Sequence, residues 1–395
     1  MTLDLSRISS EVERLAIDAE LKSGPGADEA LVRAYLDVLD DDLRSRMATA
    51  RTSWLLARPD GVFRAAAAAR EAAGDFAVVA SDGSFILPDR HSPARFYLIN
   101  VGKVLLRYGT EPMAELSAEP TLYYREEELY VPNSVRRVPV NGAVLGLKRS
   151  TEELRAVAER AAGLPCPTLA LQDGSLILWA LESQPDFVLD WVLDPFLETM
   201  QRLRQASIPV AGFISAPGSR DVLNTLRVSV CDYPGLGRAV NCDDCRGRIA
   251  TEGRVPACDV LPDVTDRHLF DRVARLRPGE RSQTFASTSK ILERYGRDFG
   301  IHFFYVHTGT EVARVEVPRW VAEDAHLLEW THAVIYDQCG RGRGYPSALQ
   351  EAHEMAVVKL EERRAVELLI EQALANHGLT ATRSAKDGSK RGRFI

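Results

Sequence analysis

The spacing of apolar residues divides the chain near residue 75. In the first part, residues 28–57 carry apolar side chains at intervals of three and four, the period of a helix with one buried face. Residues 61–73 are rich in alanine, which has the highest helix propensity. We therefore predict a helical region over residues 1–74, with Asp28 as a helix start signal. This region contains no chemical motif, which favours a packing or docking role.

Between residues 75 and 230, short apolar runs alternate with longer amphipathic stretches. The runs predict strands and the longer stretches predict helices. The expected strands are 76–81, 167–172 and 208–215, and the expected helices are 150–163, 185–206 and 218–229. This alternation indicates a mixed α/β core whose strands are buried on both faces.

Two local signals refine this core. Residues 94–109 have the pattern of a hairpin, with Asn100 and Gly102 near its turn. The helix from residue 150 is predicted to begin with Ser150 as its N-cap, because Glu153 follows at the spacing of a capping box. Both signals predict where elements begin or turn.

The pattern changes again after residue 230. Cysteines, glycines and prolines interrupt residues 231–262, which we interpret as a Cys-rich insertion. The elements expected beyond it are a helix over 266–276, a hairpin around Gly309 built from 301–309 and 310–320, and a long helix over 347–378. The predicted organisation is a helical region over 1–74, a main domain over 75–380 that includes the insertion, and a basic, solvated tail over 381–395.

Composition and charge restrict the class of protein. The chain has 395 residues, 45% of them apolar and 27% charged, as in ordinary globular proteins. It contains no run of 18 apolar residues, so we predict no membrane span. The first residues lack the pattern of a secretory signal, so a cytoplasmic location is expected. The net charge of −7 argues weakly against nucleic acid as a partner, although binding depends on local basic surface.

The sequence Asp-Gly-Ser occurs twice behind a predicted strand, at Asp82 and at Asp173. Open α/β sheets bind ligands at the carboxyl ends of their strands. One copy is most simply a turn, whereas two copies make a ligand site as plausible as a pair of turns. Paired carboxylates repel each other unless a cation lies between them, and Mg²⁺ and Mn²⁺ prefer oxygen ligands. Glu153, with Glu152 beside it, is the candidate third acid, and a solvated helix face is the alternative for either glutamate.

A second group of candidates precedes the predicted C-terminal helix. Arg341 and Arg343 lie in a glycine-rich loop that could contact phosphates, and Tyr345 follows them. Pro346 suits the first turn of a helix, which would present His353 eight residues after Tyr345. A lone helical histidine is more often structural than catalytic, so the candidacy of His353 depends on this neighbouring loop.

Seven motifs occur in an order that is known from one protein family. They are VVASDGSFILPDRH, YLINVG, KRSTEELRAVAE, LALQDGSL, VAGFISAPGSRDVLNTLR, EVARVEVPRWV and GYPSALQEAHEMAVV. Through these motifs the chain resembles the NurA nucleases over residues 75–370. The resemblance implies an RNase H-like fold, a ring-shaped homodimer, and exonuclease and endonuclease activity on DNA that depends on Mn²⁺ or Mg²⁺. It also implies a HerA-type hexameric ATPase as partner, a DNA translocase, in the processing of double-strand break ends during DNA repair.

The resemblance also assigns residues. Carried over by position, the metal-binding and catalytic acids are Asp82, Glu153 and Asp173, and His353 contributes from the last helix. Glu153 is chosen over Glu152 because it directly precedes the leucine of the family pattern. The loop that ends at Tyr345 supplies the expected DNA contacts, namely Arg341, Arg343 and Tyr345.

Four of the six cysteines lie close together in sequence: Cys231, Cys242, Cys245 and Cys258. Cys242 and Cys245 have the two-residue spacing of a metal knuckle, and cytosolic proteins rarely use disulfides. A structural Zn²⁺ site with four thiolates fits this pattern, and an iron–sulfur cluster would use the same ligands. The alternative is unliganded thiols in a loop, because only one such pair is present.

Two functions of other classes stay open at this point. One is a non-catalytic module that binds DNA or docks on a translocase, and the other is a zinc-dependent nucleic-acid binder, which rests on the cysteines alone. The presence of Asp82, Asp173 and His353 together favours the enzyme.

Overall fold

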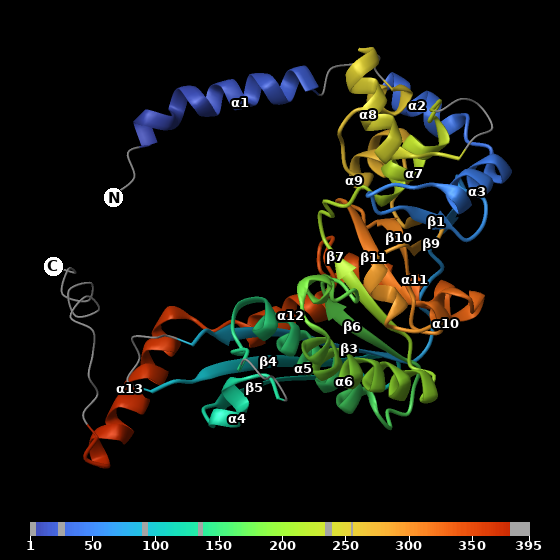
Figure 1. The fold of residues 1–395 in the computed structure, drawn as a ribbon. Coiled ribbons are helices and arrows are strands. Elements are labelled where there is room, and N and C mark those ends of the chain that lie inside the picture. Colours follow the sequence, from blue (N-terminus) through green and yellow to red (C-terminus); the bar gives the residue numbers. More distant parts are fainter. Residues whose placement is uncertain are drawn as a thin grey trace.

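The structure of the chain is a computed structural model that describes residues 5–22, 28–88, 94–132, 137–233, 239–253 and 256–379. Its strands are β1 (Ala57–Pro59), β2 (Ala66–Ala68), β3 (Phe76–Ile86), β4 (Tyr97–Tyr108), β5 (Met113–Tyr123), β6 (Thr168–Asp173), β7 (Val210–Ile214), β8 (Glu280–Ser282), β9 (Phe285–Ser287), β10 (Ile301–His307) and β11 (Val312–Pro318). Among the described residues they form one 11-stranded sheet. Its order is β1-β9-β10-β11-β7-β6-β3-β4-β5, and off this path β8 pairs with β10 and β2 pairs with β8 (Figure 1).

Helices are distributed over both faces of this sheet. They are α1 (Ser9–Lys22), α2 (Glu29–Leu36), α3 (Asp40–Thr49), α4 (Glu126–Leu129), α5 (Gly142–Ala161), α6 (Asp186–Gln205), α7 (Asp221–Ser229), α8 (Cys242–Glu252), α9 (Asp266–His268), α10 (Arg319–Ala322), α11 (Ala325–Arg341), α12 (Ser347–Ala356) and α13 (Leu360–Asn376). Strand and helix segments alternate from β6 to α7, as the sequence pattern predicts.

Five neighbouring strands position the candidate residues. β3 runs antiparallel to β4 and parallel to β6, and β6 runs parallel to β7. β4 and β5 are antiparallel, so β3, β4 and β5 form a meander on one side of the parallel strands. Parallel neighbours require a crossover connection, which α5 supplies between β5 and β6 and α6 supplies between β6 and β7.

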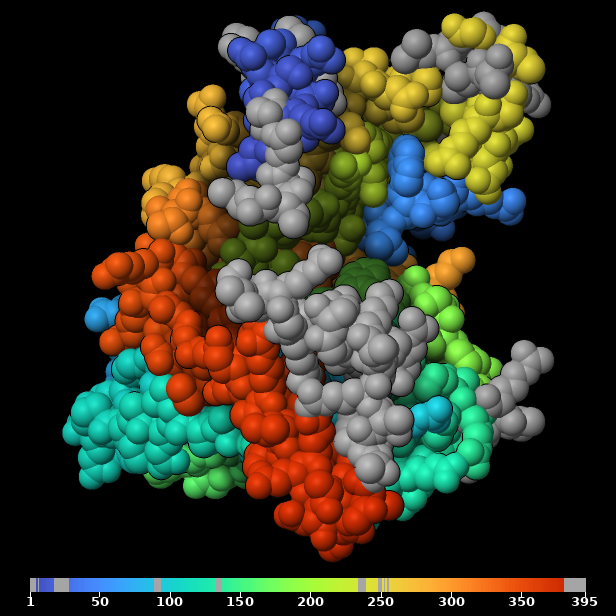
Figure 2. All heavy atoms as spheres, turned by 90° about the vertical axis from the view of Figure 1, so that its left-hand side faces the viewer, coloured from blue at the N-terminus to red at the C-terminus, as the bar shows by residue number. Residues whose placement is uncertain are grey.

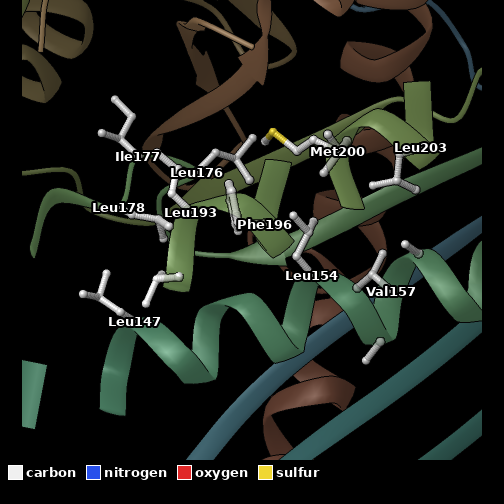
Figure 3. Packing of buried hydrophobic residues seen from close by; sticks show 14 of the residues in the cluster. Leu147, Leu154, Val157, Leu176, Ile177, Leu178, Leu193, Phe196, Met200 and Leu203 are labelled. Carbon is white, nitrogen blue, oxygen red and sulfur yellow. The ribbon is translucent and has the colours of Figure 1, made fainter. Parts of the chain in front are cut away.

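Helices bury both faces of this part of the sheet. On one face α5 packs against α6, and Leu154 of α5 faces Phe196 and Met200 of α6 (Figure 3). On the other face Ile335 of α11 and Ala352 of α12 belong to the same buried cluster as Val315 and Val317 of β11. Burial on both faces explains why these strands read as near-continuous apolar runs.

The other half of the sheet has its own buried cluster. Leu31 of α2, Leu43 of α3 and Leu226 of α7 pack there with Phe303 and Tyr305 of β10. Both rings are fully buried, so this face of the strand belongs to the core. α8 of the Cys-rich insertion lies at the far end of this half (Figure 1).

The helix expected over residues 61–73 is wrong. This segment contains β2, which pairs with β8, and no helix is assigned between residues 61 and 73, all of which are described. Phe63 lies between the rings of Tyr35 and Phe285, at centroid distances of 5.9 and 5.8 Å, and is 2% exposed. Burial of this ring and pairing of the alanines with β8 outweigh their helix propensity, which is a weak preference of well under 1 kcal/mol per residue.

The hairpin expected over residues 94–109 is also wrong. β4 is a single strand from Tyr97 to Tyr108, and Gly102 lies opposite Asp82 of β3 in its middle. A Cβ atom on Gly102 would lie only 2.3 Å from the backbone oxygen of Ala352 in α12. The glycine therefore admits a helix against the sheet and makes no turn.

The predicted helix start at Ser150 is two turns too late. α5 begins at Gly142, with Asn141 as its N-cap, and Ser150 lies inside the helix, where its hydroxyl donates to the carbonyl oxygen of Gly146 at 3.2 Å. The upstream residues include Leu147, which is buried against α6 and extends the apolar stripe. Packing thus lengthens the helix beyond its apparent capping box.

The long helix expected over residues 347–378 is interrupted. α12 ends at Ala356, and α13 begins at Leu360. The carbonyl oxygen of Ala356 accepts hydrogen bonds from the side chains of Ser84 and Asn100, at 2.5 and 2.8 Å. β3 and β4 thereby hold the end of α12 in place. The predicted strands at β6 and β7, the helices α6 and α7 and the β10–β11 hairpin around Gly309 are confirmed.

The two terminal helices lie on one face of the molecule. Figure 2 has α1 in blue at the upper end of this face and α13 in red at the lower end. Within the described parts of the chain, no helix is long and apolar enough to cross a membrane. The tail predicted over 381–395 lies outside the described residues.

Candidate active site

The two Asp-Gly-Ser segments lie side by side because β3 and β6 are parallel and in register. Ser81 is the partner of Gln172, so Asp82 and Asp173 follow at the same level of the sheet. Asp173 is the last residue of β6, as predicted. Asp82 is not at a strand end, because β3 continues to Ile86 in pairing with β4. It lies where the pairing of β3 with β6 stops.

Glu153 of α5 is buried next to these two aspartates and is 1% exposed. Its Oε2 accepts a long hydrogen bond of 3.4 Å from Gln172. Its Oε1 lies 3.0 Å from Nε of Arg149, yet it accepts no hydrogen bond from a described residue. Burial raises the pKa of Glu153 to about 7; Arg149 opposes this effect, and the negative charges of Asp82 and Asp173 add to it. Asp82 and Asp173 are therefore close enough to influence the ionisation of Glu153.

The glycines of the two Asp-Gly-Ser segments have different roles. A Cβ atom on Gly83 would lie 2.5 Å from Oε1 of Glu153, so only glycine leaves room for the buried carboxylate. Gly174 has a φ of +94°, and it turns the chain after β6. The first glycine thus provides space and the second provides a turn.

Glu152 and Glu153 point to different environments. Glu152 accepts hydrogen bonds from Tyr123, Lys148 and Arg155 at 2.8, 2.6 and 3.0 Å, and these contacts hold its pKa below the usual range in spite of burial. Successive residues of a helix face different directions. The structure therefore brings Glu153, and not Glu152, together with the aspartates.

His353 reaches the site from the opposite face of the sheet. Gly102 lets α12 approach β4 closely, and this contact brings His353 next to Asp82, with Nδ1 at 2.8 Å from Oδ2. The ring remains 57% exposed. Since Nδ1 faces the carboxylate, Nε2 is the ring nitrogen left for exchange with a substrate or water.

Tyr345 contacts the second aspartate. Its hydroxyl donates a hydrogen bond to the carboxylate of Asp173, and its ring packs edge-on against Phe213 at 5.4 Å. Burial and the adjacent acid raise the pKa of Tyr345, so the hydroxyl stays protonated near neutral pH. Burial also raises the pKa of Asp173, although the hydrogen bond from Tyr345 opposes the shift. Tyr345, predicted as a DNA contact, is thus part of the acidic cluster.

The two arginines of the loop differ in their contacts. Arg341 donates two hydrogen bonds to Asp337, at 2.6 and 3.0 Å, and its guanidinium lies 4.3 Å from the ring centroid of Tyr108. Arg343 is exposed and has a φ of +58°. Of the pair, Arg343 is the better placed to contact a phosphate.

The donor set fits a hard divalent cation. Three carboxylates converge, one of them holds a buried oxygen without a hydrogen bond, and these are the oxygen ligands that Mn²⁺ and Mg²⁺ prefer. As the side chains stand, no group of three or more His, Cys, Asp or Glu residues within the described ranges already has the geometry to hold a metal ion. The side chains would therefore have to adjust around an ion.

The four clustered cysteines come within electrostatic reach of one another. All four are free thiols. Burial raises the pKa of Cys258 to about 12, and Asp259 and the other three thiols contribute to the shift. As their side chains stand, the described cysteines do not form a closed set of metal ligands. The structural Zn²⁺ site, like its iron–sulfur alternative, stays a prediction.

A family model described as the NurA domain matches residues 76–358, which is more than half of the chain. The chain belongs to the NurA family. As a NurA protein it is a nuclease, and its sheet is the mixed α/β sheet that the sequence predicts. No curated protein matches the chain in sequence.

Two solved structures are similar to this NurA chain. One is the catalytic domain of human endonuclease V, with 13% identity over 88% of this chain and 98% of that chain, and a TM-score of 0.28. The other is LC9-RNase H1, a type 1 RNase H with the type 2 active-site motif, with 13% identity over 38% of this chain and 67% of that chain, and a TM-score of 0.20.

The sequence pattern did not single out two residues of this site. Arg149 contacts Glu153 and also donates to the carbonyl oxygen of Gly83 at 2.7 Å. Its position four residues before Glu153 on one helix was an available signal, because such pairs face each other. Gln172 precedes Asp173 directly, and nothing in its sequence context indicates that it turns toward Glu153.

Proposed function

We propose that this NurA protein is a deoxyribonuclease that depends on Mn²⁺ or Mg²⁺. The observation that carries the proposal is the convergence of Asp82, Glu153 and Asp173, with one oxygen of the buried Glu153 left without a hydrogen bond. Neighbouring carboxylates repel one another, and a divalent cation bound between them offsets this repulsion.

Each residue has a role in phosphodiester hydrolysis. Asp82, Glu153 and Asp173 would hold the metal, which when bound supplies an activated water and offsets charge on the phosphate. His353, oriented by Asp82 through Nδ1, exchanges a proton with the attacking water or the leaving oxygen at Nε2. Tyr345 donates to Asp173 and so keeps this carboxylate oriented.

Cleavage of labelled linear DNA with Mn²⁺, with Mg²⁺ and with EDTA tests the proposal. We expect cleavage with either cation and none with EDTA. Asp82→Asn and Asp173→Asn should each lower the rate by more than about 100-fold, since loss of a mere supporting partner of a metal site already costs 10- to 100-fold. Wild-type rates in both variants, or cleavage in EDTA, would reject the metal site.

The adjacent glutamates provide a matched pair. Glu153→Gln should be inactive, because it removes a buried carboxylate that faces Asp82 and Asp173. Glu152→Gln should cleave like the wild type, because this side chain contacts Tyr123, Lys148 and Arg155 instead. The reverse result would move the third acid to Glu152.

The proposal includes partners. We propose a HerA-type hexameric ATPase that feeds DNA to the nuclease during double-strand break processing, and a homodimer of this chain. β5 supports the second part, because it is an edge strand exposed along nearly its whole length. Light scattering on the purified protein measures the oligomeric state, and a monomer at micromolar concentration would contradict the homodimer.

The segment that we propose to dock on the ATPase is shorter than the whole of residues 1–74. Leu31, Leu43 and Phe63 are buried in the body of the protein, so deletion of the whole region would remove part of the core. Leu5, Val12 and Leu15 are exposed and lie at helical spacing in and before α1. We expect a chain without residues 1–22 to cleave DNA alone but to lose co-elution with the ATPase. Retained co-elution would exclude α1 as the docking element.

The second candidate function is a non-catalytic module that binds DNA or docks on the translocase. The contact of His353 with Asp82 and the hydrogen bond of Tyr345 to Asp173 argue against it, because a module without catalysis has no use for them. The cleavage assay separates the two functions directly.

A further inference from the structure

A further acid, which is buried, lies next to the candidate site on β11. Glu316 is 1% exposed, and its Oε2 accepts hydrogen bonds from the hydroxyl of Ser175 at 2.7 Å and from the backbone N–H of Leu176 at 2.9 Å. Ser175 and Leu176 belong to the turn that directly follows Asp173. Glu316 therefore holds the segment that carries one of the three acids.

A glycine on the intervening strand makes this contact possible. β7 lies between β11 and β6, and Gly212 of β7 is the partner of Glu316. A Cβ atom on Gly212 would lie 2.5 Å from the carbonyl oxygen of Gly174. Without a side chain at residue 212, the turn lies directly on the sheet, within reach of the glutamate from the next strand.

The other end of Glu316 is held by a buried arginine. Oε1 accepts a hydrogen bond of 2.9 Å from Nε of Arg314, which is 2% exposed. The guanidinium lies 3.6 Å from the ring centroid of Phe303 and donates to Asp221, at the start of α7, at 2.9 Å. The arginine thus compensates the buried charge of Glu316 and restricts its rotation, and it connects the turn to the second half of the molecule.

The buried ion pair of Arg314 and Glu316 is not explained by a gain in the stability of the fold. Replacing such pairs by apolar residues of similar volume is often neutral or stabilising, because the charges lose their hydration. A precise position for a neighbouring group is one property that an ion pair provides and an apolar contact does not.

We propose that Glu316, oriented by Arg314, is a positioning residue for Asp173. It fixes the turn at Ser175 and Leu176, and through it the direction in which the Asp173 carboxylate points. The inference rests on the proposed metal-dependent function. Glu316 itself touches neither substrate nor metal in this role.

Glu316→Gln tests the proposal. The amide cannot accept at both ends, so either the turn or Arg314 loses its partner. We expect the Mn²⁺ concentration for half-maximal cleavage to rise at least about tenfold, the range seen when partners of metal ligands are removed. DNA binding in EDTA should not change. An unchanged Mn²⁺ dependence in a folded Glu316→Gln variant overturns the proposal.

Ser175→Ala covers the case in which Glu316→Gln does not fold. It removes one of the two hydrogen bonds without leaving a charge unpaired, and it should shift the Mn²⁺ dependence in the same direction by a smaller factor. A folded Ser175→Ala variant with the Mn²⁺ dependence of the wild type counts against the proposal.

Asp266→Asn is the matched control. Asp266 is equally buried and belongs to the same half of the molecule, but it contacts α7 and Tyr305 rather than the turn. Asp266→Asn should lower the melting temperature without changing the Mn²⁺ dependence. If it shifts the Mn²⁺ dependence as much as Glu316→Gln does, the effect of Glu316→Gln is explained by general destabilisation. The proposed function fails if the wild type shows no metal-dependent cleavage. The positioning role of Glu316 fails if the wild type cleaves DNA and the Glu316→Gln variant keeps the same Mn²⁺ dependence.

Discussion

At the scale of single residues, space and solvation decide which acid joins the site. Glu153 lies against Gly83 and lacks a hydrogen bond at one oxygen, and burial raises its pKa to about 7. Glu152, one residue earlier, has three donors and a lowered pKa. A buried carboxylate with few donors is disfavoured in its charged form, so a metal that supplies positive charge would gain most at Glu153.

Gly83→Ala should reduce cleavage strongly while the protein stays folded. The added Cβ would lie 2.5 Å from Oε1 of Glu153, so the carboxylate must move. Gly146→Ala is the control on α5, where a Cβ meets no atom within 4 Å. Because alanine favours a helix over glycine by about 1 kcal/mol, this variant should raise the melting temperature at unchanged activity. Equal activity in the two variants would contradict the crowding at Gly83.

At the scale of elements, one buried acid caps a helix from a distance. Asp266 of α9 accepts hydrogen bonds from the N–H groups of Val222 and Leu223, at 3.1 and 2.8 Å, in the first turn of α7. The hydroxyl of Tyr305 donates to it as well, at 2.7 Å. Burial raises the pKa of Asp266 to about 7, and the charge of Asp221 adds to the shift, whereas these three donors oppose it. α7 is therefore sensitive to the ionisation of a residue outside it.

The stability of the protein should reflect this ionisation. An acid with a raised pKa binds its proton more tightly in the folded state, so its contribution is present below the ordinary pKa of 3.8 and is lost as the pH rises through about 7. A difference of about three in pKa corresponds to on the order of 4 kcal/mol. Denaturant unfolding of the wild type and of Asp266→Asn between pH 4 and 8 measures it. The wild type should lose free energy of unfolding relative to the variant as the pH rises, and parallel curves would show that the donors keep Asp266 ionised throughout.

At the scale of the whole molecule, one sheet joins two halves with different tasks. The half around β3 and β6 carries the acidic site, and the half around β10 carries α2, α3, α7 and the Cys-rich insertion. Arg314 and Glu316 lie between them, with contacts to both. Among the residues of the insertion whose burial the structure describes, the buried apolar side chains are Val240 and Leu261. Such segments commonly depend on a metal for order.

Substitution of Cys242 and Cys245 by serine should therefore lower the melting temperature and abolish bound zinc, and leave cleavage per folded molecule unchanged. A site with four thiolate ligands has no open position at which water could be activated. Elemental analysis of protein purified without chelator measures the zinc. Less than about a tenth of an equivalent of zinc and iron together would reject the site, and iron with visible absorbance would replace zinc by a cluster. A folded variant that cannot cleave DNA would contradict the structural role.

The sequence by itself determined the family, the order of strands and helices around the site, and the two aspartates. Asp82 and Asp173 were identifiable because an apolar run followed by Asp-Gly-Ser occurs twice, and the parallel, in-register pairing of β3 with β6 brings the two copies side by side. Features that depend on contacts between distant segments could not be predicted from the sequence, and only the tertiary structure decided them. Gly102 was expected in a turn but instead contacts α12. Glu153 was chosen over Glu152 from the family pattern, and the tertiary structure shows the different environments of the two side chains. Glu316 lies more than a hundred residues from Asp173 in the chain, and only the sheet order makes it a neighbour of that turn.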